Sequence, residues 1–508
     1  MTALPEVSPL DEFNRTLIQN VHPRDWKNPV PTGRYNLVVI GAGSAGLITS
    51  AIAAGLGAKV ALVERHFLGG DCLNVGCVPS KGLIRASRLI AESRRAAELG
   101  VTAPSGEQID FAAAMRHMRR VRARISAEDA ATRYRDELGV DVYLGEASFT
   151  GEGSAVVDGT VLEFAKAVIA SGARAVAPPI PGLAEAGFLD NETLFNLTER
   201  PRRLGVIGGG PMGCEMAQAF RRLGSEVVLF DVAEHILVRE DADAAEIVQK
   251  RFLEEGVQLA LRSQLERVEV RGAEKVIHLE DADGNRREVG VDEILVAVGR
   301  AANVEGLDLE AAGVAYAPGK GVGVNDYLQT SNPRIYAAGD ICMEWKFTHA
   351  ADAAAKIVVQ NALFYRSKKL SDLVMPWCTY TDPEIAHVGL YPHEAAEQGL
   401  EIDSFEVPLE SVNRAVADGE EEGFVKIHTK QGTDQILGAT IVAAHAGDLI
   451  SQVTLAIVGK VGLGKIGDVI FPYPTQAEGI KRAAGAYTRT RLTPFAKRLV
   501  DRWMAWRR

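Results

Sequence analysis

The chain has 508 residues, of which 47% are hydrophobic and 24% are charged, a composition typical of a soluble globular protein rather than a disordered one. Its 56 Lys and Arg residues against 67 Asp and Glu residues leave a net charge of −11, which argues against a general nucleic-acid binder. Five cysteines are too few for a disulfide scaffold and indicate a reducing compartment. Since no secretory signal or long apolar run is visible, we expect a cytoplasmic protein.

The first ordered unit is predicted just after a polar extension. The first 33 residues are polar and contain five prolines, and we expect one short helix and a linker there. The largely apolar residues 35–40 predict a buried strand, which ends at a G-x-G-x-x-G turn formed by Gly41, Gly43 and Gly46. A helical stretch follows, and a second apolar strand ends before Glu64. This order predicts a βαβ unit that binds a nucleotide.

The same pattern recurs further along the chain, with a turn at Gly208, Gly210 and Gly213 and an acid at Asp231. In each copy the first glycine permits the tight turn, the second lets a pyrophosphate approach, and the third lets helix and strand pack closely. The helix N-terminus then holds the phosphate charge, and the acid accepts the ribose hydroxyls. Two copies predict two dinucleotide sites, one for a flavin and one for a nicotinamide.

Cys72 and Cys77 lie five residues apart after the first acid. In a regular helix five residues rise about 7.5 Å, more than the ~4.4–6.8 Å between Cα atoms that a disulfide tolerates. A bond therefore requires a distorted turn, which Gly76 would allow. Zinc binding fits less well, because no second ligand pair follows, and structural thiols are the remaining alternative.

Further elements are predicted along the rest of the chain. Apolar residues at helical spacing indicate helices over residues 108–137, and strands are expected at 291–299 and 335–340. Strand-like runs at 424–427 and 436–442, followed by helical stretches, indicate a mixed α+β final domain.

These motifs, in this order, resemble those of the class I pyridine nucleotide–disulfide oxidoreductases, the family of dihydrolipoyl dehydrogenase, glutathione reductase and mercuric reductase. The resemblance spans about residues 35–487 and rests on residues 41–46, 72–81, 208–215, 298–300, 330–340 and 380–384. It implies an α/β fold with two Rossmann-like dinucleotide-binding domains, for FAD and NAD(P), and an α+β C-terminal domain that forms a homodimer. The implied divisions are an extension (1–33), a first FAD-binding part (34–174), an NAD(P)-binding domain (175–300), a second FAD-binding part (301–373) and an interface domain (374–508).

The resemblance also implies roles for individual residues. Cys72 would be the outer, substrate-facing thiol of a redox-active disulfide, and Cys77 the inner thiol against the flavin. Lys81 and Glu215 would form an ion pair near the flavin N5. The residues assigned to the cofactors are Gly41, Gly43, Gly46, Glu64, Gly172, Gly339 and Asp340 for FAD, and Gly208, Gly210, Gly213, Asp231 and Gly299 for NAD(P). NAD(P)H would reduce FAD, the flavin would reduce the disulfide, and the dithiol would reduce an acceptor.

The coenzyme follows from the acid of the second unit. Asp231 would repel a 2′-phosphate and accept hydrogen bonds from a 2′-hydroxyl. The first Lys or Arg after it is Arg239. The sequence therefore favours NADH over NADPH.

The C-terminal domain departs from the family's disulfide reductases, which carry a histidine oriented by a glutamate. Here Glu478 is present, but Tyr473 stands in the histidine position. With a pKa near ~10, tyrosine is a poor base at neutral pH, and mercuric reductase also carries a tyrosine there. The chain thus resembles the mercuric reductase branch. It lacks that enzyme's C-terminal cysteine pair, since no cysteine follows Cys378, and we expect no N-terminal metal-binding domain of that enzyme's kind.

Several acceptors and functions stay open. A soft metal ion such as Hg(II) would reach Cys72 and Cys77 directly as a transient substrate, and no resident metal site is predicted. Small disulfides are the other acceptor class. The alternative functions are a dihydrolipoyl dehydrogenase-like enzyme, a flavin diaphorase or NADH oxidase, and a non-catalytic redox sensor.

The chain ends in a basic segment that is predicted to be helical. Thr493 and Pro494 are suited to be the N-cap and the first helical residue. An apolar stripe at helical spacing follows, made of Phe495, Leu499, Trp503 and Trp506. Because residues 479–508 hold nine Lys or Arg and one Asp, we expect weak contact with an anionic membrane surface or with protein.

Overall fold

The computed structural model describes residues 5–101 and 109–508. The first four residues of the predicted extension, residues 102–107 of the first FAD-binding part, and residue 108, where the predicted helical stretch begins, lie outside the described residues. The chain divides into two compact units. Unit 1 comprises the described residues up to Gly208, with Met216–Val232 and Arg262–Leu373; unit 2 comprises Gly209–Glu215, Ala233–Leu261 and Val374–Arg508. The domain boundaries expected from the sequence stay a prediction.

The central sheet of unit 1 contains the first strand predicted from the sequence. Its strand order is β3-β2-β1-β6-β5-β4, with β18 paired to β6. The pairs among β3, β2, β1, β6 and β18 are parallel, and β5 and β4 continue the sheet in antiparallel fashion. The bounds are β1 (Tyr35–Ile40), β2 (Val60–Glu64), β3 (Asp141–Leu144), β4 (Ala147–Gly151), β5 (Ser154–Val157), β6 (Thr160–Ile169) and β18 (Ile335–Ala337).

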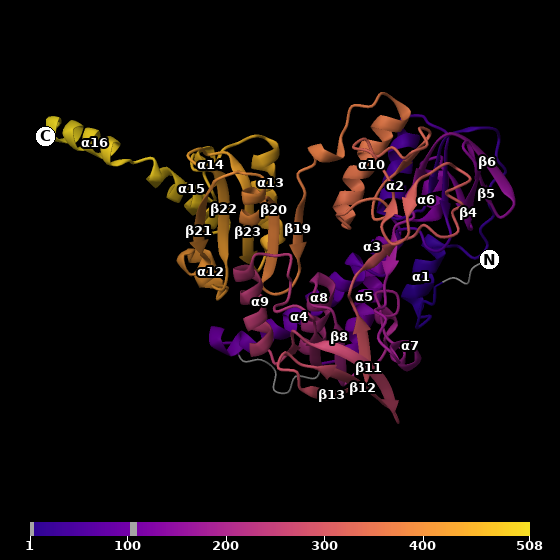
Figure 1. Cartoon of the computed structure of the whole chain (residues 1–508), viewed down its shortest axis with the longest axis horizontal. Coiled ribbons are helices and arrows are strands. Elements are labelled where there is room, and N and C mark those ends of the chain that lie inside the picture. Colours follow the sequence, from indigo (N-terminus) through magenta and orange to yellow (C-terminus); the bar gives the residue numbers. More distant parts are fainter. Residues whose placement is uncertain (1–4, 102–108) are drawn as a thin grey trace. The chain divides into compact units, whose positions relative to one another are not determined.

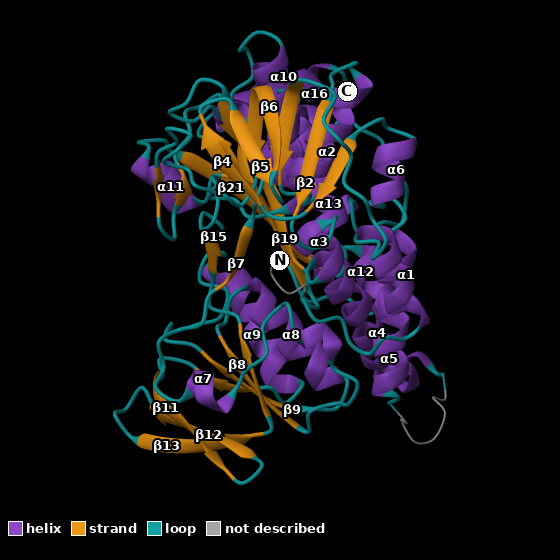
Figure 2. Cartoon of the chain, turned by 90° about the vertical axis from the view of Figure 1, so that its right-hand side faces the viewer, coloured by secondary structure: helices purple, strands orange, loops and turns teal. Residues whose placement is uncertain are grey.

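Helices cover this sheet because its strands are apolar on both faces. Leu37, Val38 and Val39 of β1 are completely buried, and α2 and α10 pack against each other beside the sheet (Figure 2). The helices of this region are α1 (Glu12–Val21), α2 (Ser44–Gly55), α3 (Gly70–Asn74), α4 (Cys77–Arg95), α5 (Phe111–Ile125), α6 (Ala131–Asp136) and α10 (Thr348–Leu363), with the 3₁₀ helix η1 (Ala96–Leu99). The helices predicted within residues 108–137 are thus confirmed for the described part.

The second predicted nucleotide unit is also a parallel sheet. In unit 1, β8 (Arg203–Ile207) pairs in parallel with β9 (Glu226–Phe230) and with β14 (Glu293–Val296). The helix after β8, α8 (Pro211–Arg222), crosses the division between the two units after Glu215. The strand predicted for 291–299 is confirmed as β14, at shorter bounds: β13 ends at Val291, and β14 starts after Asp292, whose carboxylate accepts the backbone N–H of Arg203 (2.8 Å).

The remaining elements of unit 1 are small. An antiparallel sheet joins three of its strands, and two short antiparallel pairs complete the unit. Their bounds are β11 (Gln264–Arg271), β12 (Glu274–Glu280) and β13 (Arg286–Val291); β7 (Ala173–Ala175) with β15 (Arg300–Ala302); β16 (Tyr316–Ala317) with β17 (Gly321–Val322); and α7 (Leu183–Ala186), η2 (Leu194–Asn196) and η3 (Leu370–Asp372).

Unit 2 is built on an antiparallel sheet of order β19-β20-β23-β22-β21 (Figure 1). Its core is formed by the inward-facing side chains of the strands and of α13 and α15. The bounds are β19 (Pro376–Thr379), β20 (Glu384–Gly389), β21 (Ile402–Pro408), β22 (Phe424–Lys430), β23 (Ile436–Ala443), β10 (Gln258–Ala260), α9 (Ala242–Glu254), α11 (Pro392–Glu397), η4 (Leu409–Ser411), α12 (Asn413–Asp418), α13 (Ala446–Val458), α14 (Leu463–Ile466), α15 (Glu478–Thr490) and α16 (Pro494–Trp506).

The C-terminal helix has the predicted start. Thr493 caps α16, since its hydroxyl accepts the backbone N–H of Ala496 (3.2 Å), and Pro494 is the first helical residue. In α16, which the structure describes in full, no residue is buried. Together the two parallel sheets and the mixed final domain confirm the predicted α/β fold with an α+β C-terminal domain.

Candidate active site

The first glycine-rich turn lies between β1 and α2 and depends on the absence of side chains. Gly41 has φ +103°, and a Cβ there would overlap the carbonyl oxygen of Ala170. A Cβ at Gly46 would overlap the carbonyl oxygen of Gly41. At Gly43, by contrast, the nearest atom to a Cβ would be 3.7 Å away, so the protein itself leaves room there. This cradle at the N-terminus of α2 fits a dinucleotide pyrophosphate.

Glu64, the acid at the end of β2, is hydrogen-bonded to this turn. Its carboxylate accepts the backbone N–H groups of Ala42 (2.7 Å) and His66 (2.8 Å). Burial raises the pKa of Glu64, and these two hydrogen bonds oppose the rise. The acid is therefore fixed beside the glycines, where the family's ribose contact is expected.

A second set of residues assigned to FAD comes from later parts of the chain. Gly339 has φ +83° and follows β18, and a Cβ there would lie 3.3 Å from the Ala45 side chain of α2. Burial raises the pKa of the next residue, Asp340, whereas the Arg300 charge lowers it; Arg300 Nε lies 3.6 Å from the Asp340 carboxylate. Gly172 has φ +69°, and its carbonyl accepts the backbone N–H of Asn303 (3.0 Å). Within unit 1, Gly339 thus lies close to α2, the helix that follows the first glycine-rich turn. The residues present at this site fit FAD.

The redox cysteines lie on two different helices. Cys72 is in α3 and Cys77 is the first residue of α4, because the helix is interrupted at Val75 and Gly76. A Cβ on Gly76 would lie 2.8 Å from the carbonyl oxygen of Asp71, which explains why glycine is needed at the break. The distortion that a Cys72–Cys77 bond requires is therefore present.

The two thiols interact. The hydrogen bond that Cys72 donates to Cys77, together with burial, raises the pKa of the Cys72 thiol. Cys77 Sγ also lies 3.4 Å from the hydroxyl of Thr348, the first residue of α10. Cys77 is exposed, whereas Cys72 is half-buried. As the first residue of α4, Cys77 lies where the helix dipole stabilises a thiolate, which supports its use as the more acidic thiol.

Arg300 adds a charge to this region that the sequence did not single out as a site residue. Its guanidinium forms an ion pair with Asp71, the residue before Cys72, and donates to the carbonyl oxygen of Ala173 (2.6 Å). Burial opposes its charge, but Asp71, Asp340 and Glu192 raise the pKa of Arg300. The Val-Gly-Arg of the resemblance was the available signal, although its partner Asp71 lies 229 positions away in the sequence.

The second glycine-rich turn repeats part of the first. Gly208 ends β8 with φ +110°, and a Cβ there would lie 2.6 Å from the carbonyl oxygen of Ala297. A Cβ at Gly210 would meet no atom within 4 Å. Gly213 is buried in α8, and Gly299, with φ +148°, accepts the backbone N–H of Val176 (3.1 Å). These positions fit the turn that the sequence predicts for a nicotinamide dinucleotide.

Three further predicted residues are placed separately. Asp231 directly follows β9 and is half-buried. Lys81 is in α4 of unit 1, and Glu215 is in the part of α8 that belongs to unit 2, where its carboxylate accepts the backbone N–H of Tyr380 (3.0 Å). The ion pair between Lys81 and Glu215 therefore stays a prediction.

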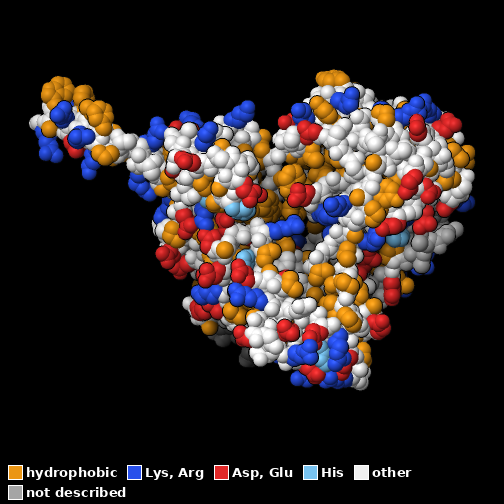
Figure 3. Space-filling view, viewed as in Figure 1, with side chains coloured by type: hydrophobic (Ala, Val, Ile, Leu, Met, Phe, Trp, Pro, Cys, Tyr) orange, Lys and Arg blue, Asp and Glu red, His pale blue; other side chains and the backbone are white. Residues whose placement is uncertain are grey.

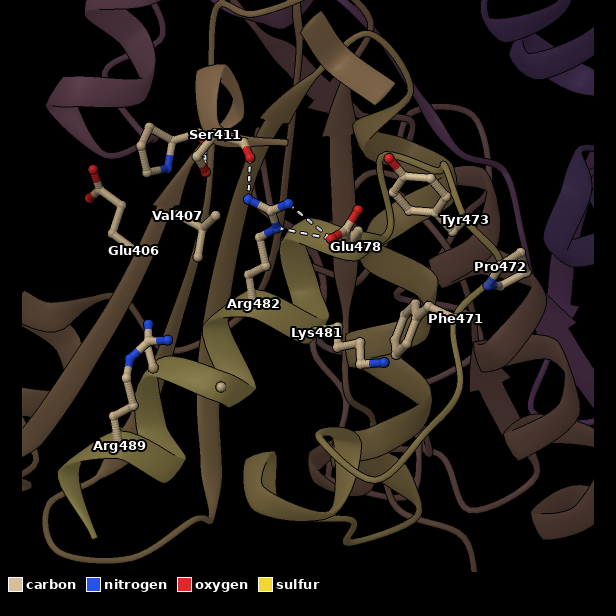
Figure 4. Close-up of a pocket in the computed structure, with 13 residues that line it drawn as sticks. Glu406, Val407, Ser411, Phe471, Pro472, Tyr473, Glu478, Lys481, Arg482 and Arg489 are labelled. Carbon is tan, nitrogen blue, oxygen red and sulfur yellow. Dashed lines mark hydrogen bonds and ion pairs between the residues drawn. The ribbon is translucent and has the colours of Figure 1, made fainter. Parts of the chain in front are cut away.

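Tyr473 and Glu478 line the same cavity of about 630 Å³ in unit 2 (Figure 4). Tyr473 is 71% exposed, and its hydroxyl accepts a hydrogen bond from Asn413 (3.1 Å). Glu478 pairs instead with Arg482 (2.9 Å), which also donates to the carbonyl oxygen of Ser411. The glutamate is thus held by an arginine one turn further along α15, a spacing of four residues that the sequence offered as a signal.

Two features, a metal-binding cluster and a membrane-spanning helix, are absent from the described residues. Within residues 5–101 and 109–508, no group of three or more His, Cys, Asp or Glu side chains is arranged to hold a metal ion. In the same part of the chain, none of the helices is both long enough and apolar enough to cross a membrane.

Comparison with known proteins identifies the class to which this fold and this site belong. Residues 35–355 match the pyridine nucleotide-disulphide oxidoreductase model, and residues 375–484 match the dimerisation domain of the same proteins. The chain therefore belongs to the pyridine nucleotide–disulphide oxidoreductase family. It is an FAD-dependent oxidoreductase of the mercuric reductase-like type.

Individual relatives show which members of the family the chain resembles. The mercuric reductase of Lysinibacillus sphaericus is 36% identical over 453 residues, covering 89% of this chain and 82% of the relative. The dihydrolipoyl dehydrogenase of Chlamydia muridarum is 31% identical over 457 residues, covering 87% and 95%. Among solved structures, the Cu(II) complex of the HOCl-induced flavoprotein disulfide reductase RclA from Escherichia coli aligns with a TM-score of 0.80 at 27% identity, covering 90% of this chain and all of that one.

Proposed function

We propose that this protein passes electrons from NAD(P)H, by way of FAD and the Cys72–Cys77 pair, to a soft metal ion such as Hg(II) or to a small disulfide. The observation that carries the proposal is the helix break at Gly76, which brings the Cys72 thiol into a hydrogen bond with Cys77 at the start of α4. If Cys72 and Cys77 had only a structural role, Cys77 would not need to lie at the N-terminus of α4 beside the Thr348 hydroxyl.

The chain's own residues hold the reacting sulfurs. When bound, FAD accepts a hydride from the nicotinamide and supplies two electrons to the disulfide. Two electrons and two protons convert the Cys72–Cys77 bond into two thiols. Re-forming the S–S bond releases two electrons and two protons: a disulfide acceptor takes up both and becomes two thiols, whereas a metal ion such as Hg(II) takes up the two electrons and the two protons pass to solvent. The thiolate of Cys77 is favoured by the α4 dipole and the Thr348 hydroxyl.

Two residues favour a metal ion over a disulfide as acceptor. Tyr473 replaces the usual base, and Glu478 is engaged by Arg482 rather than by the tyrosine, so neither residue is set up to accept the proton of an attacking thiol at neutral pH. Metal-ion relatives support the same choice, since the curated matches include mercuric reductases and RclA was solved as a Cu(II) complex.

NADH is the proposed electron donor. Asp231 follows β9 and its carboxylate is suited to the 2′-hydroxyl of NADH rather than to a 2′-phosphate. The match to the dimerisation model supports a homodimer as the working form. Asp231→Ala combined with a cation at the next position is expected to raise activity with NADPH relative to NADH.

An anaerobic titration tests the electron path. The purified flavoprotein should take up two electrons per subunit beyond those held by the flavin, and Cys72→Ser should abolish both this uptake and acceptor turnover. Cys378→Ala, at a cysteine of unit 2, is the matched control and should change neither. Unchanged turnover in Cys72→Ser would show a diaphorase or NADH oxidase, and absence of turnover with any acceptor would show a redox sensor.

An acceptor panel identifies the substrate class. With NADH and with NADPH the enzyme is offered Hg(II), Cu(II), glutathione disulfide and a quinone, and dihydrolipoamide is tested with NAD in the reverse direction. We expect turnover with Hg(II) that depends on Cys72. Turnover of dihydrolipoamide at a comparable rate would replace the proposal with a dihydrolipoyl dehydrogenase-like function.

We further propose that α16 binds an anionic membrane surface. Its apolar side is exposed, with Trp503 and Trp506 at 54% and 76%, and Figure 3 shows hydrophobic and basic side chains together on this helix. Helices of this composition lie in the lipid headgroup region. The helix lies beyond residue 484, where the match to the dimerisation model ends.

Sedimentation with vesicles tests the membrane contact. The intact protein should sediment with phosphatidylglycerol–phosphatidylcholine vesicles at low salt and not with phosphatidylcholine alone. A Trp503→Glu and Trp506→Glu double variant should stay in solution, whereas Ile470→Glu, at a 90% exposed apolar residue outside α16, should bind as the wild type does. A change of oligomeric state in the double variant without vesicle binding by the wild type would assign the helix to a second copy and refute the proposal.

A further inference from the structure

The N-terminal extension forms a helix that lies outside the family match. α1 spans Glu12–Val21, whereas the family model begins at residue 35. Asp11 caps the helix, since its carboxylate accepts the backbone N–H of Asn14 (2.9 Å), and the same carboxylate pairs with Arg119 of α5 (2.6 Å). Leu17 and Val21 are buried. The helix is therefore packed and anchored on α5.

A buried arginine connects this helix to the segment that carries the cysteines, residues 68–77, here called the redox segment. Arg122 of α5 is 2% exposed. It donates one hydrogen bond to the side-chain oxygen of Asn14 (2.8 Å) and another to the carbonyl oxygen of Asn74 (2.6 Å). Asn74 ends α3 and lies between Cys72 and Cys77, so Asn14 is one side chain away from the break between the two thiols.

A second contact joins the other end of the redox segment to α1. The backbone N–H of Leu68 donates to the carbonyl oxygen of Val21 (3.1 Å). The Asn74 side chain in turn donates to the carbonyl oxygens of Leu68 and Gly70 (both 2.9 Å). The extension thus contacts the segment directly just before α3 and reaches the last residue of α3 through Arg122, on either side of Cys72.

The chemistry of Arg122 makes this connection sensitive to change. Burial, with the neighbouring Arg119 charge, lowers the pKa of Arg122 to about 10, so the guanidinium stays charged at neutral pH. A buried charge needs its hydrogen-bond acceptors, because an unmade bond leaves the full desolvation cost. Removing the Asn14 oxygen therefore frees the guanidinium to reorient, and its bond to Asn74 weakens with it.

We propose that the N-terminal helix is a positioning element for the redox cysteines, acting through the Asn14–Arg122–Asn74 hydrogen bonds. The proposal rests on the proposed function, in which Cys72 and Cys77 form the redox couple. It assigns a role to a segment that the family model does not include. Asn14 and Arg122 act through the backbone of the redox segment and are positioning residues rather than catalytic ones.

The test compares two asparagines of the extension. Asn14→Ala removes the acceptor for Arg122, whereas Asn20→Ala removes a hydrogen bond from α1 to Ser126, the C-cap of α5 (2.9 Å), that does not reach the redox segment. In Asn14→Ala we expect the midpoint potential of the dithiol couple and the long-wavelength absorbance of the two-electron-reduced flavoprotein to change. Iodoacetamide alkylation of the reduced thiols is expected to change by about tenfold, as small misplacements of reacting groups do.

The controls separate positioning from simple destabilisation. Asn20→Ala should leave the potential, the absorbance and the alkylation rate as in the wild type, at a similar loss of melting temperature. Asn14→Asp, which keeps an oxygen acceptor for Arg122, should restore the wild-type alkylation rate. Equal values for Asn14→Ala and wild type at a lowered melting temperature would refute the inference, while unchanged acceptor turnover in Cys72→Ser would refute the proposed function instead.

Discussion

Replacing Gly76 by alanine is expected to disturb the approach of the two redox thiols. Gly76 stands between α3 and α4, and a Cβ there would lie 2.8 Å from the carbonyl oxygen of Asp71 and 3.2 Å from its carbonyl carbon. Both atoms belong to the backbone, which cannot turn away as a flexible side chain can. The added methyl group must therefore move the chain between Cys72 and Cys77.

The magnitude follows from the kind of contact. Forcing an extra methyl group against packed atoms costs about 1–3 kcal/mol. A shift of about 1 Å between reacting groups lowers a rate by about 100-fold. For Gly76→Ala we expect the free energy of unfolding to fall by about 1–3 kcal/mol. We also expect Cys72-dependent acceptor turnover to fall by a factor that approaches about 100. Turnover of a flavin-reducible dye, which does not use the cysteines, should change by less than about threefold, since the nucleotide turns are not touched.

The assay combines unfolding with redox spectroscopy. Urea unfolding followed by circular dichroism gives the stability change, and anaerobic reduction gives the thiolate-dependent absorbance. Gly55→Ala is the matched control, because that glycine ends α2 and a Cβ there meets no atom within 4 Å; it should be neutral or slightly stabilising. Wild-type stability, absorbance and turnover in Gly76→Ala would refute the argument that this break positions the thiols.

Three other predictions follow from the site. Gly41→Ala, which places a Cβ against the carbonyl oxygen of Ala170 at φ +103°, should weaken FAD retention by about 1–3 kcal/mol, measured as flavin released on dilution; full retention would contradict the cradle. Burial raises the pKa of Asp129 to about 6 from 3.8, so the folded state binds the extra proton and stability falls as pH rises through this range; Asp129→Asn should add about 3 kcal/mol at pH 8 and less than about 1 kcal/mol at pH 4, and an equal gain at both pH values would contradict it. Tyr473→His alone should leave glutathione disulfide turnover within about threefold, whereas adding Arg482→Leu, which releases the acid at the start of α15, should raise it about tenfold; a full gain in the single variant would show that this acid is not engaged.

The sequence predicted the local features of the site well. The glycines of the first turn, the break near Gly76 and the start of α16 at Thr493 all depend on what one residue can do within its own few neighbours. A missing Cβ, a hydroxyl cap and a fixed proline φ have the same effect in most folds. The strand predicted over 291–299 is confirmed as β14, although its bounds, Glu293–Val296, are narrower than predicted.

The partners of the polar site residues were not readable in the same way. Thr348 lies 271 positions from Cys77 and 3.4 Å from its sulfur. The sequence placed Glu478 as an orienting acid, yet its carboxylate pairs with Arg482. The Thr348 contact depends on where the chain returns after a long interval, whereas the Glu478–Arg482 pair is local, at a spacing of four residues. In both cases a polar side chain offers the same donors and acceptors to any neighbour.

By itself the sequence determined the class of the protein, because two glycine-rich turns and a cysteine pair demand specific backbone conformations wherever they occur. Only the tertiary structure decided which groups surround the thiols: the Thr348 hydroxyl at Cys77, and the Asn14–Arg122–Asn74 connection from the N-terminal helix. The physical reason is that the choice of partner is made by packing between segments that are distant in the chain, and that burial makes the hydrogen bonds of Arg122 obligatory.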